Sequence, residues 1–174
     1  MIAQTSDSIL VDTLKSTFEI YKFPFDQNFV AISALPEKKY LKSDLKFISE
    51  SNISTVITLV EKSELESYGL ADFFDELGEN KLHYFHFPIQ DYGVPTKSQM
   101  DSIFKEIVSI LGRNENILIH CKGGLGRSGT VMASFMKNYI NKSNSIEQVR
   151  QIRGEQAIET RQQEQFVLDY VYEQ

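Results

Sequence analysis

Residues 117–130 read Ile-Leu-Ile-His-Cys-Lys-Gly-Gly-Leu-Gly-Arg-Ser-Gly-Thr, an apolar run that leads into a glycine-rich segment. The run Ile117–Ile119 predicts a short buried strand. After Ser128, apolar side chains recur at helical spacing and predict a helix; they are Val131, Phe135, Met136, Tyr139 and Ile140. The stretch therefore predicts a strand, a tight turn and a helix in direct succession.

The glycine-rich turn has the composition of an anion-binding loop. Three glycines within four residues, at 123, 124 and 126, let backbone amides approach an anion closely. The helix that follows adds its positive N-terminal end. We therefore expect a phosphate-sized cradle made by Lys122, Gly123, Gly124, Leu125, Gly126 and Arg127.

Four side chains of this stretch are candidates for chemistry. Cys121 is expected at the base of the cradle, where the amides, the helix dipole and Arg127 favour the thiolate, the nucleophilic form. Arg127 can hold two phosphoryl oxygens with its planar fork. Ser128 can donate a hydrogen bond to the sulfur when the sulfur is the leaving group. His120 can hold the loop by bonding backbone carbonyls.

Each of these features also has an ordinary structural explanation. A single cysteine is often a small buried apolar residue, a glycine-rich turn is often only a turn, and an arginine is often a surface charge. The combination His-Cys-x2-Gly-x2-Arg-Ser/Thr is far rarer, with a chance occurrence on the order of one in ten thousand for a chain of this length. The combination favours the functional interpretation.

The regions around this loop predict alternating strands and helices. Apolar runs at 29–32, 53–60 and 82–87 are typical of buried strands. A capping box, Thr96 to Gln99, precedes a helical stripe of apolar residues from Met100 to Leu111. Further helices are expected to begin near capping patterns at Ser145/Gln148 and Thr160/Gln163. This order predicts an α/β fold with a central, mostly parallel sheet flanked by helices.

The length of 174 residues and the 41% of hydrophobic side chains fit one globular domain over residues 1–174. Residues 1 to about 20 form either a helix packed on the outside or a loose arm. No apolar run is long enough to span a bilayer and no signal-peptide core is present, so we expect a cytoplasmic protein without a membrane partner.

Charge and cysteine content narrow the function classes. The net charge of −6 argues against a nucleic-acid partner, although it is compatible with a local basic pocket. The single cysteine excludes an intrachain disulfide. His83 and His86 lie three apart in a strand-like run and would face opposite sides, so we expect no metal site and no cofactor.

The stretch from Cys121 to Ser128 resembles the motif Cys-x5-Arg-Ser/Thr of the protein tyrosine phosphatase superfamily. The resemblance implies a cysteine-phosphatase fold, a phosphocysteine intermediate without a metal, and an aspartic acid on a separate upstream loop as general acid. The segment 87–95 is similar to that loop, which makes Asp91 the candidate acid. Judged from the residues alone, Asp91 is equally plausible as a turn aspartate.

The chain is shorter than the tyrosine-specific domains of the superfamily and lacks a counterpart of their phosphotyrosine-recognition loop, so it resembles the dual-specificity branch. Within that branch it is similar to the cyclin-dependent kinase-associated phosphatases through three further segments: Ser33-Ala34-Leu35-Pro36, Glu64-Leu65-x-x-Tyr68 and Ala157-Ile158-x-Thr160-x-x-Gln163. This implies a phosphorylated protein substrate carrying phosphotyrosine, phosphoserine or phosphothreonine. A cyclin-dependent kinase partner follows from the resemblance alone.

Two positions in the last segment have alternative roles. Gln163 either positions the hydrolytic water, as the corresponding glutamine does in some relatives, or closes the capping box that Thr160 opens. Arg153, followed by Gly154, either supports the phosphate loop from behind or forms an ordinary helix C-terminus. The pattern favours the helix end for Arg153.

Three other functions stay open. Lys122 directly follows the cysteine, as in the phosphoinositide 3-phosphatases of the superfamily, but their second lysine is replaced here by Leu125. The RNA 5′-triphosphatases of capping enzymes share the same core, but the negative net charge of the chain gives little support to an RNA-binding surface. A catalytically weak phospho-binding module would keep the cradle and lose the nucleophile or the acid, whereas Cys121 and Arg127 are both present.

Overall fold

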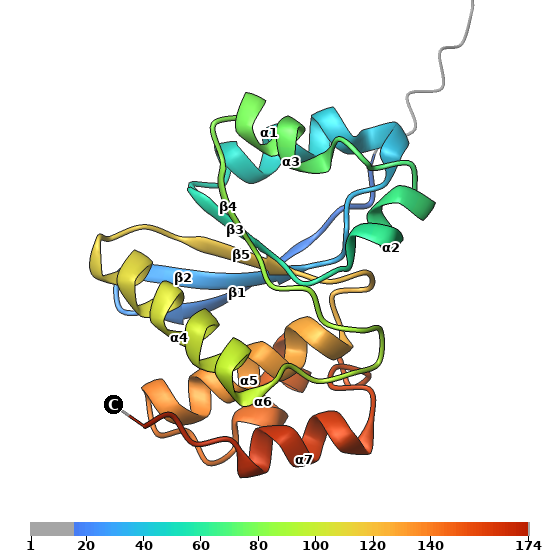
Figure 1. The fold of residues 1–174 in the computed structure, drawn as a ribbon. Helices are drawn as coiled ribbons and strands as arrows, with labels where there is room; N and C mark the ends of the chain where they lie inside the picture. The colour runs from blue at the N-terminus through green and yellow to red at the C-terminus, as the bar shows by residue number, and fades with distance from the viewer. Residues whose placement is uncertain (1–15, 174) are drawn as a thin grey trace, which may run out of the picture.

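A five-stranded sheet lies at the centre of the computed structural model, which describes residues 16–173, and helices cover both of its faces (Figure 1). The strand order is β1-β2-β5-β3-β4, in which β2, β5, β3 and β4 are parallel and β1 is antiparallel to β2. The predicted α/β fold with a mostly parallel sheet is confirmed. The strands are β1 (Ile20–Phe25), β2 (Asn28–Ser33), β3 (Thr55–Thr58), β4 (His83–His86) and β5 (Ile117–His120).

The central strand β5 is buried on both faces, as its continuous apolar run predicts. Ile117 and Ile119 face one hydrophobic core, and Leu118 faces a second core on the other side of the sheet. The alternation follows from the two-residue period of a strand. The sheet thus separates two cores, and β5 fixes the position of the loop that follows it.

Strand β1 was not predicted from the sequence, nor were the helices that lie between β2 and β4. It begins at Ile20, inside the segment expected to be a peripheral helix or a loose arm, and Pro24 lies within it. Proline is tolerated there because β1 is an edge strand. Phe23 and Phe25 are buried, and a turn at Asp26 with φ +52° leads directly into β2. Residues 1–15 of the expected N-terminal segment lie outside the described residues.

One face of the sheet carries the helices α4, α5, α6 and α7 (Figure 1). The capping boxes at Thr96/Gln99 and Thr160/Gln163 are both present. The helix predicted to begin near Ser145 begins there, but the capping contact is missing, because Ser145 is already the first helical residue and the N-cap Asn144 makes no side-chain cap hydrogen bond. The bounds are α4 (Lys97–Gly112), α5 (Gly126–Tyr139), α6 (Ser145–Arg153) and α7 (Arg161–Asp169).

The opposite face carries the helices α1 and α3 (Figure 1). A 3-10 turn, η1 (Lys38–Tyr40), leads into α1 (Leu41–Glu50), and α2 (Lys62–Ser67) and α3 (Phe73–Glu79) follow β3. None of the helices within residues 16–173 combines the length and the apolar character that a membrane-spanning helix requires.

The parallel strands bring several connections to one edge of the sheet. The loops after β2, β3, β4 and β5 all leave the carboxyl ends of their strands, which lie at the same edge. In open α/β sheets this edge is where ligands bind. It holds Cys121 after β5, Glu64 after β3 and Asp91 after β4.

Candidate active site

The loop from Cys121 to Arg127, called the phosphate loop below, directs its backbone carbonyls outward, away from the concave side of the loop. Each backbone carbonyl from residue 121 to residue 126 accepts a hydrogen bond from a group outside the concave side of the loop. The partners are His120 Nδ1 for Cys121, Leu35 N for Lys122, Arg153 for Gly123 and Gly124, Gly129 N and Ile158 N for Leu125, and Thr130 Oγ1 for Gly126.

This bonding pattern decides the direction of the amides. In a trans peptide the N–H points opposite to the carbonyl, and the described residues contain no cis peptide bond. The amides of residues 122–127 therefore point toward the inside of the curve. Together with the N-terminus of α5, which begins at Gly126, they form a concave set of donors suited to a tetrahedral oxyanion.

The packing of the phosphate loop against the end of β2 requires a glycine at position 124. Its φ is +65°, and a Cβ at this position would overlap the backbone of Ser33 and come within 2.6 Å of Ala34 N. The loop thus lies directly against the end of β2, at a distance that only glycine allows. This contact fixes the curve of the loop from behind.

Cys121 and Ser128 meet at the base of the loop. The Cys121 Sγ lies 3.4 Å from the Ser128 Oγ, and both side chains are buried. This is the spacing of a weak hydrogen bond to sulfur, in which the hydroxyl donates when the sulfur is a thiolate. The predicted juxtaposition of thiol and hydroxyl is present.

His120 joins the loop to the neighbouring strand. Its Nε2 lies 2.9 Å from Thr58 Oγ1 in β3, and its Nδ1 lies 3.4 Å from the Cys121 carbonyl. Burial, and to a lesser extent the charge of Arg127, lowers the pKa of His120 to about 4. The ring is therefore neutral near pH 7. It contacts one backbone carbonyl of the loop, and its role in holding the loop stays a prediction.

Arg127 is held by a carboxylate that the sequence had not marked as a site residue. Its two terminal nitrogens lie 2.7 and 2.9 Å from the oxygens of Glu64, and Nη1 also donates to the Ile89 carbonyl at 3.0 Å. The Arg127 side chain is only 2% exposed. A two-point pairing of this kind fixes the plane of the guanidinium.

The same pairing keeps both groups charged. Burial alone would raise the pKa of Glu64, but the hydrogen bonds from Arg127 and from the Glu61 amide, with the charges of Arg127 and Lys122, lower it. Burial would likewise lower the pKa of Arg127, and the Glu64 contact, together with the charges of Cys121 and Asp91, raises it. Arg127 therefore keeps its positive charge at the end of the phosphate loop.

Asp91 lies within reach of Arg127 on the loop that follows β4. Its Oδ1 is 3.1 Å from Arg127 Nη2, and its side chain is 53% exposed. The loop is tied to the sheet by bonds from Phe87 N to Thr58 O and from Ile89 N to Leu59 O. The structure thus places the candidate acid beside the phosphate loop, at the solvent side.

Gln163 connects three segments. Its Oε1 accepts from the amides of Glu159 and Thr160 at 2.8 and 3.2 Å, which completes the capping box, and its Nε2 donates to Gly93 O at 3.1 Å. The capping interpretation is confirmed. The contact with Gly93 also links α7 to the loop that carries Asp91.

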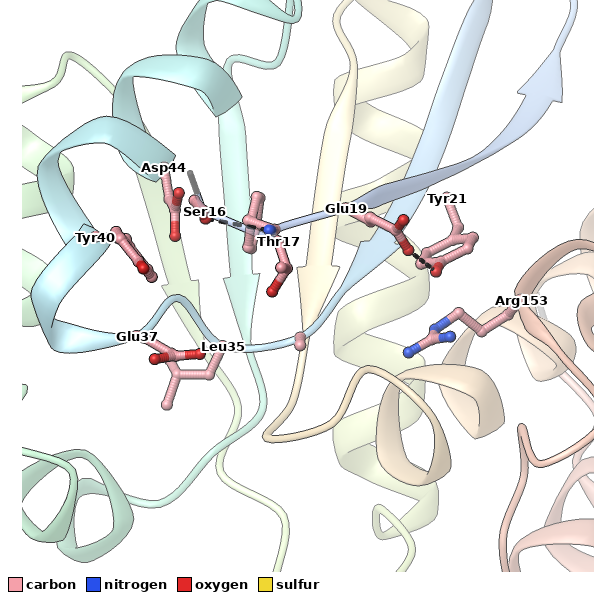
Figure 2. A pocket seen from close by; sticks show the side chains of 11 residues that line it. Ser16, Thr17, Glu19, Tyr21, Leu35, Glu37, Tyr40, Asp44 and Arg153 are labelled. Atoms are coloured by element: carbon pink, nitrogen blue, oxygen red, sulfur yellow. Dashed lines mark hydrogen bonds between the residues drawn. The ribbon is translucent and has the colours of Figure 1, made fainter. Parts of the chain in front are cut away.

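Arg153 is the last residue of α6 and is followed by the C-cap Gly154, so the predicted helix end is present. Its side chain also supports the phosphate loop, which is the alternative that the pattern did not favour. Its Nε donates to Gly124 O at 2.7 Å and its Nη2 to Gly123 O at 2.9 Å, while its guanidinium lies over the Tyr21 ring. Figure 2 shows Arg153 entering, beside Tyr21, a cavity of about 130 Å³ between β1, the β2–α1 connection and α6. Tyr21 belongs to β1, the strand that the sequence did not reveal.

Residues 31–139 of the chain match the family model described as "Polymorphic toxin system, DSP-PTPase phosphatase". The chain belongs to this phosphatase family. It is 27% identical over 179 residues to the rat (Rattus norvegicus) cyclin-dependent kinase inhibitor 3, an alignment that covers 95% of this chain and 84% of that protein.

Solved structures give the same result. Kinase associated phosphatase with a serine in place of its catalytic-site cysteine aligns with a TM-score of 0.79 at 26% identity, over 88% of this chain and 93% of that one. The active form of Tk-PTP aligns with a TM-score of 0.67 at 33% identity, over 80% and 88%. The chain is thus a cysteine-dependent phosphatase of the dual-specificity and tyrosine phosphatase class.

Lys122 lies at the rim of the phosphatase site. Its Nζ lies 3.8 Å from the centre of the Tyr68 ring, a cation–π contact at the end of α2. Its charge also contributes to the lowered pKa of Glu64. In this position Lys122 adds positive charge at the rim of the site while its side chain packs against the Tyr68 ring.

Within residues 16–173, no group of three or more His, Cys, Asp or Glu side chains is arranged to hold a metal ion.

Proposed function

We propose that this phosphatase removes phosphate from phosphotyrosine, phosphoserine or phosphothreonine in proteins, through a phosphocysteine intermediate on Cys121. One observation carries the proposal. The Cys121 Sγ lies at the start of a loop whose carbonyls at residues 121–126 are all bonded away from the curve, so its amides are free for an oxyanion. Arg127 and these amides supply the positive charge that the reaction needs, and the proposal requires no metal ion.

In the first step the Cys121 thiolate attacks phosphorus, a P–S bond forms, and the P–O bond to the leaving group breaks. Arg127 and the loop amides hold the other phosphoryl oxygens. Asp91 gives its proton to the departing oxygen, which would otherwise leave as a strong base.

The contact of Asp91 with Arg127 supports this order of events. Arg127 Nη2 lies 3.1 Å from Asp91 Oδ1. We infer that a bound phosphate draws on the same guanidinium. An incoming phosphate therefore competes with the Asp91 carboxylate for Arg127. Displaced from Arg127, or protonated, Asp91 becomes available to the leaving oxygen.

In the second step water attacks the phosphocysteine and gives a proton to a nearby carboxylate, and the P–S bond breaks with its electron pair left on Sγ. Ser128 Oγ, at 3.4 Å from Sγ, donates a hydrogen bond to the sulfur as it leaves. We infer that Gln163 assists this step, which its hydrogen bond to Gly93 O on the Asp91 loop supports.

A phosphoinositide is the second candidate substrate, favoured by the extra positive charge of Lys122 at the rim of the site. The position that would hold a second cation is occupied by Leu125. An inositol headgroup with several phosphates is therefore less well matched than a single phosphoamino acid.

Kinetics with and without Cys121 test the proposal. Wild type and Cys121→Ser are assayed in EDTA on p-nitrophenyl phosphate, on phosphotyrosine and phosphothreonine peptides, and on phosphoinositides. We expect wild type to hydrolyse the aryl phosphate and at least one peptide, and Cys121→Ser to fall below about a thousandth of that rate while still binding a phosphopeptide. Hydrolysis of phosphoinositides alone would favour the second candidate, and binding without hydrolysis by wild type would favour a phospho-binding module.

A cyclin-dependent kinase as partner belongs to the proposal only through the similarity to the kinase-associated phosphatases. A cytoplasmic location and a single domain over residues 1–174 also stay predictions.

A further inference from the structure

The carboxylate of Glu159 lies directly against the phosphate loop. A Cβ placed on Gly126 would overlap the Glu159 carboxylate and would come within 3.0 and 3.1 Å of the Gln163 side-chain amide. Gly126 is the residue before Arg127, and its own amide is one of those that point into the curve of the loop. A carboxylate therefore lies at the wall of the site, in addition to those of Asp91 and Glu64.

The backbone around Glu159 is held in place. Ile158 N donates to Leu125 O at 3.1 Å, so this segment is bonded to the phosphate loop itself. Arg150 donates to the carbonyls of Ala157 and Ile158 at 3.0 and 3.1 Å. The Glu159 amide donates to Gln163 Oε1 at 2.8 Å.

Ile158 has a φ of +62°, which is rare and costly for a β-branched residue. The surrounding bonds maintain this conformation, and it sets the direction in which the next residue leaves the loop. The position of the Glu159 carboxylate is thus built into the backbone.

The carboxylate has no structural partner in the part of the chain that the structure describes, residues 16–173: neither a hydrogen bond nor an ion pair to its oxygens is present there. Its side chain is exposed to solvent. A carboxylate against an anion-binding loop opposes the binding of an anion, so a purely structural role would place the wrong charge there. A group that can take a proton from water fits the position better.

We propose that Glu159 is a catalytic base for the second step of the reaction, a proposal that rests on the phosphocysteine mechanism proposed above. Water bound between Glu159 and the phosphocysteine gives a proton to the Glu159 carboxylate as its oxygen forms a bond to phosphorus. The P–S bond breaks, its electron pair stays on Cys121 Sγ, and phosphate leaves. The proton on Glu159 then passes to solvent.

The Gln163 amide, next to Glu159 at Gly126, positions the same water. Asp91 is left as a carboxylate after the first step and gives a second, weaker route for the proton. Loss of Glu159 is therefore expected to slow the second step and to leave the first step intact.

Pre-steady-state kinetics separate the two steps. Wild type, Glu159→Gln, Glu159→Ala and Glu159→Asp are mixed rapidly with p-nitrophenyl phosphate, and the phosphorylated protein is measured by intact mass after acid quench. Glu155→Gln is the matched control, because Glu155 is an exposed glutamate of the same segment and the change removes the same charge.

We expect Glu159→Gln and Glu159→Ala to release the first equivalent of p-nitrophenol at the wild-type rate and then to turn over about ten to a hundred times more slowly, with phosphocysteine accumulating. Glu159→Asp should recover part of the rate, and Glu155→Gln should match wild type.

Two results would overturn the inference while leaving the proposed function intact. One is wild-type turnover in Glu159→Gln without accumulated phosphocysteine. The other is a lower KM with an unchanged or higher kcat, which would mean that the carboxylate only repels the phosphate. Failure of the proposed function itself is recognised separately, as the absence of Cys121-dependent turnover in wild type.

Discussion

The Glu64 carboxylate binds the Arg127 guanidinium with both oxygens, at 2.7 and 2.9 Å, and so joins α2 to the start of α5. The arginine that is expected to bind phosphate is thereby oriented before any substrate arrives. Such pre-organisation lowers the cost of ordering the site when the substrate binds.

The first prediction concerns the loss of the Glu64–Arg127 ion pair. Glu64→Gln keeps the size of the side chain but leaves Arg127 buried without its counter-charge, so we expect the free energy of unfolding to fall by about 2 kcal/mol. The value of kcat/KM should fall about ten- to a hundredfold, since the guanidinium loses its fixed plane. Urea denaturation and steady-state kinetics measure the two effects.

Glu66→Gln is the control for this change, since Glu66 is an exposed glutamate of the same helix. The pH dependence gives a further check. Because the pKa of Glu64 is held below its usual 4.5, its contribution to stability is present above about pH 4.5 and is lost as the pH falls through the lower value of the folded state. The stability difference between wild type and Glu64→Gln should therefore shrink in acid, and a difference that persists unchanged would contradict the ion-pair explanation.

A second prediction compares two neighbouring glycines. Gly124→Ala places a methyl group into the Ser33 backbone at a φ of +65°, whereas a Cβ on Gly123 would meet only Leu125 Cδ1, at 3.8 Å. We expect Gly124→Ala to cost at least about 2 kcal/mol of stability and to weaken vanadate inhibition, and Gly123→Ala to cost less than about 1 kcal/mol. Thermal unfolding and inhibition by vanadate provide the comparison. Equal effects at both positions would mean that the loop does not depend on its contact with β2.

A third prediction uses the buried histidine. His120 has a pKa of about 4 in the folded protein, below its usual 6.5, so the unfolded chain binds more protons between these two values. Stability should therefore rise as the pH increases from about 4 to about 6.5, by up to about 3 kcal/mol for this group. His120→Gln should lack this part of the slope in urea denaturation at several pH values. The same slope in the variant would assign it to other groups.

The sequence indicated the centre of the molecule because its signals there are local. An apolar run, three glycines and a helical stripe follow one another in 117–140, and both β5 and α5 appear where those patterns predict them. The capping boxes at Thr96 and Thr160 are equally local, since each joins residues three apart.

The contacts that the sequence alone did not establish join residues over long separations. Glu64 lies 63 residues before the arginine that it binds, and Arg153 lies 29 residues after Gly124. No spacing rule connects such positions, because the contact exists only once the sheet has brought the loops to one edge. For Glu64, the segment Glu64-Leu65-x-x-Tyr68, shared with the kinase-associated phosphatases, was a signal that went unused.

The last prediction tests Asp91, whose position beside Arg127 is compatible with two roles. As a general acid it should matter only as far as the leaving oxygen needs a proton. An alkyl alkoxide from serine or threonine is a very poor leaving group, a tyrosine phenolate, with a pKa of about 10, is intermediate, and an activated aryl oxide departs with little help.

Asp91→Asn keeps the shape of the loop and removes the acid, so its cost should be largest on a phosphothreonine peptide, smaller on a phosphotyrosine peptide and smallest on p-nitrophenyl phosphate. The phosphothreonine loss should be about a hundred- to ten-thousandfold, the usual worth of general acid catalysis. Asp91→Asn also removes a carboxylate from Arg127 Nη2, which by itself should tighten vanadate binding. A uniform loss on all three substrates, with vanadate binding unchanged, would mean that Asp91 only braces its loop and that another group donates the proton.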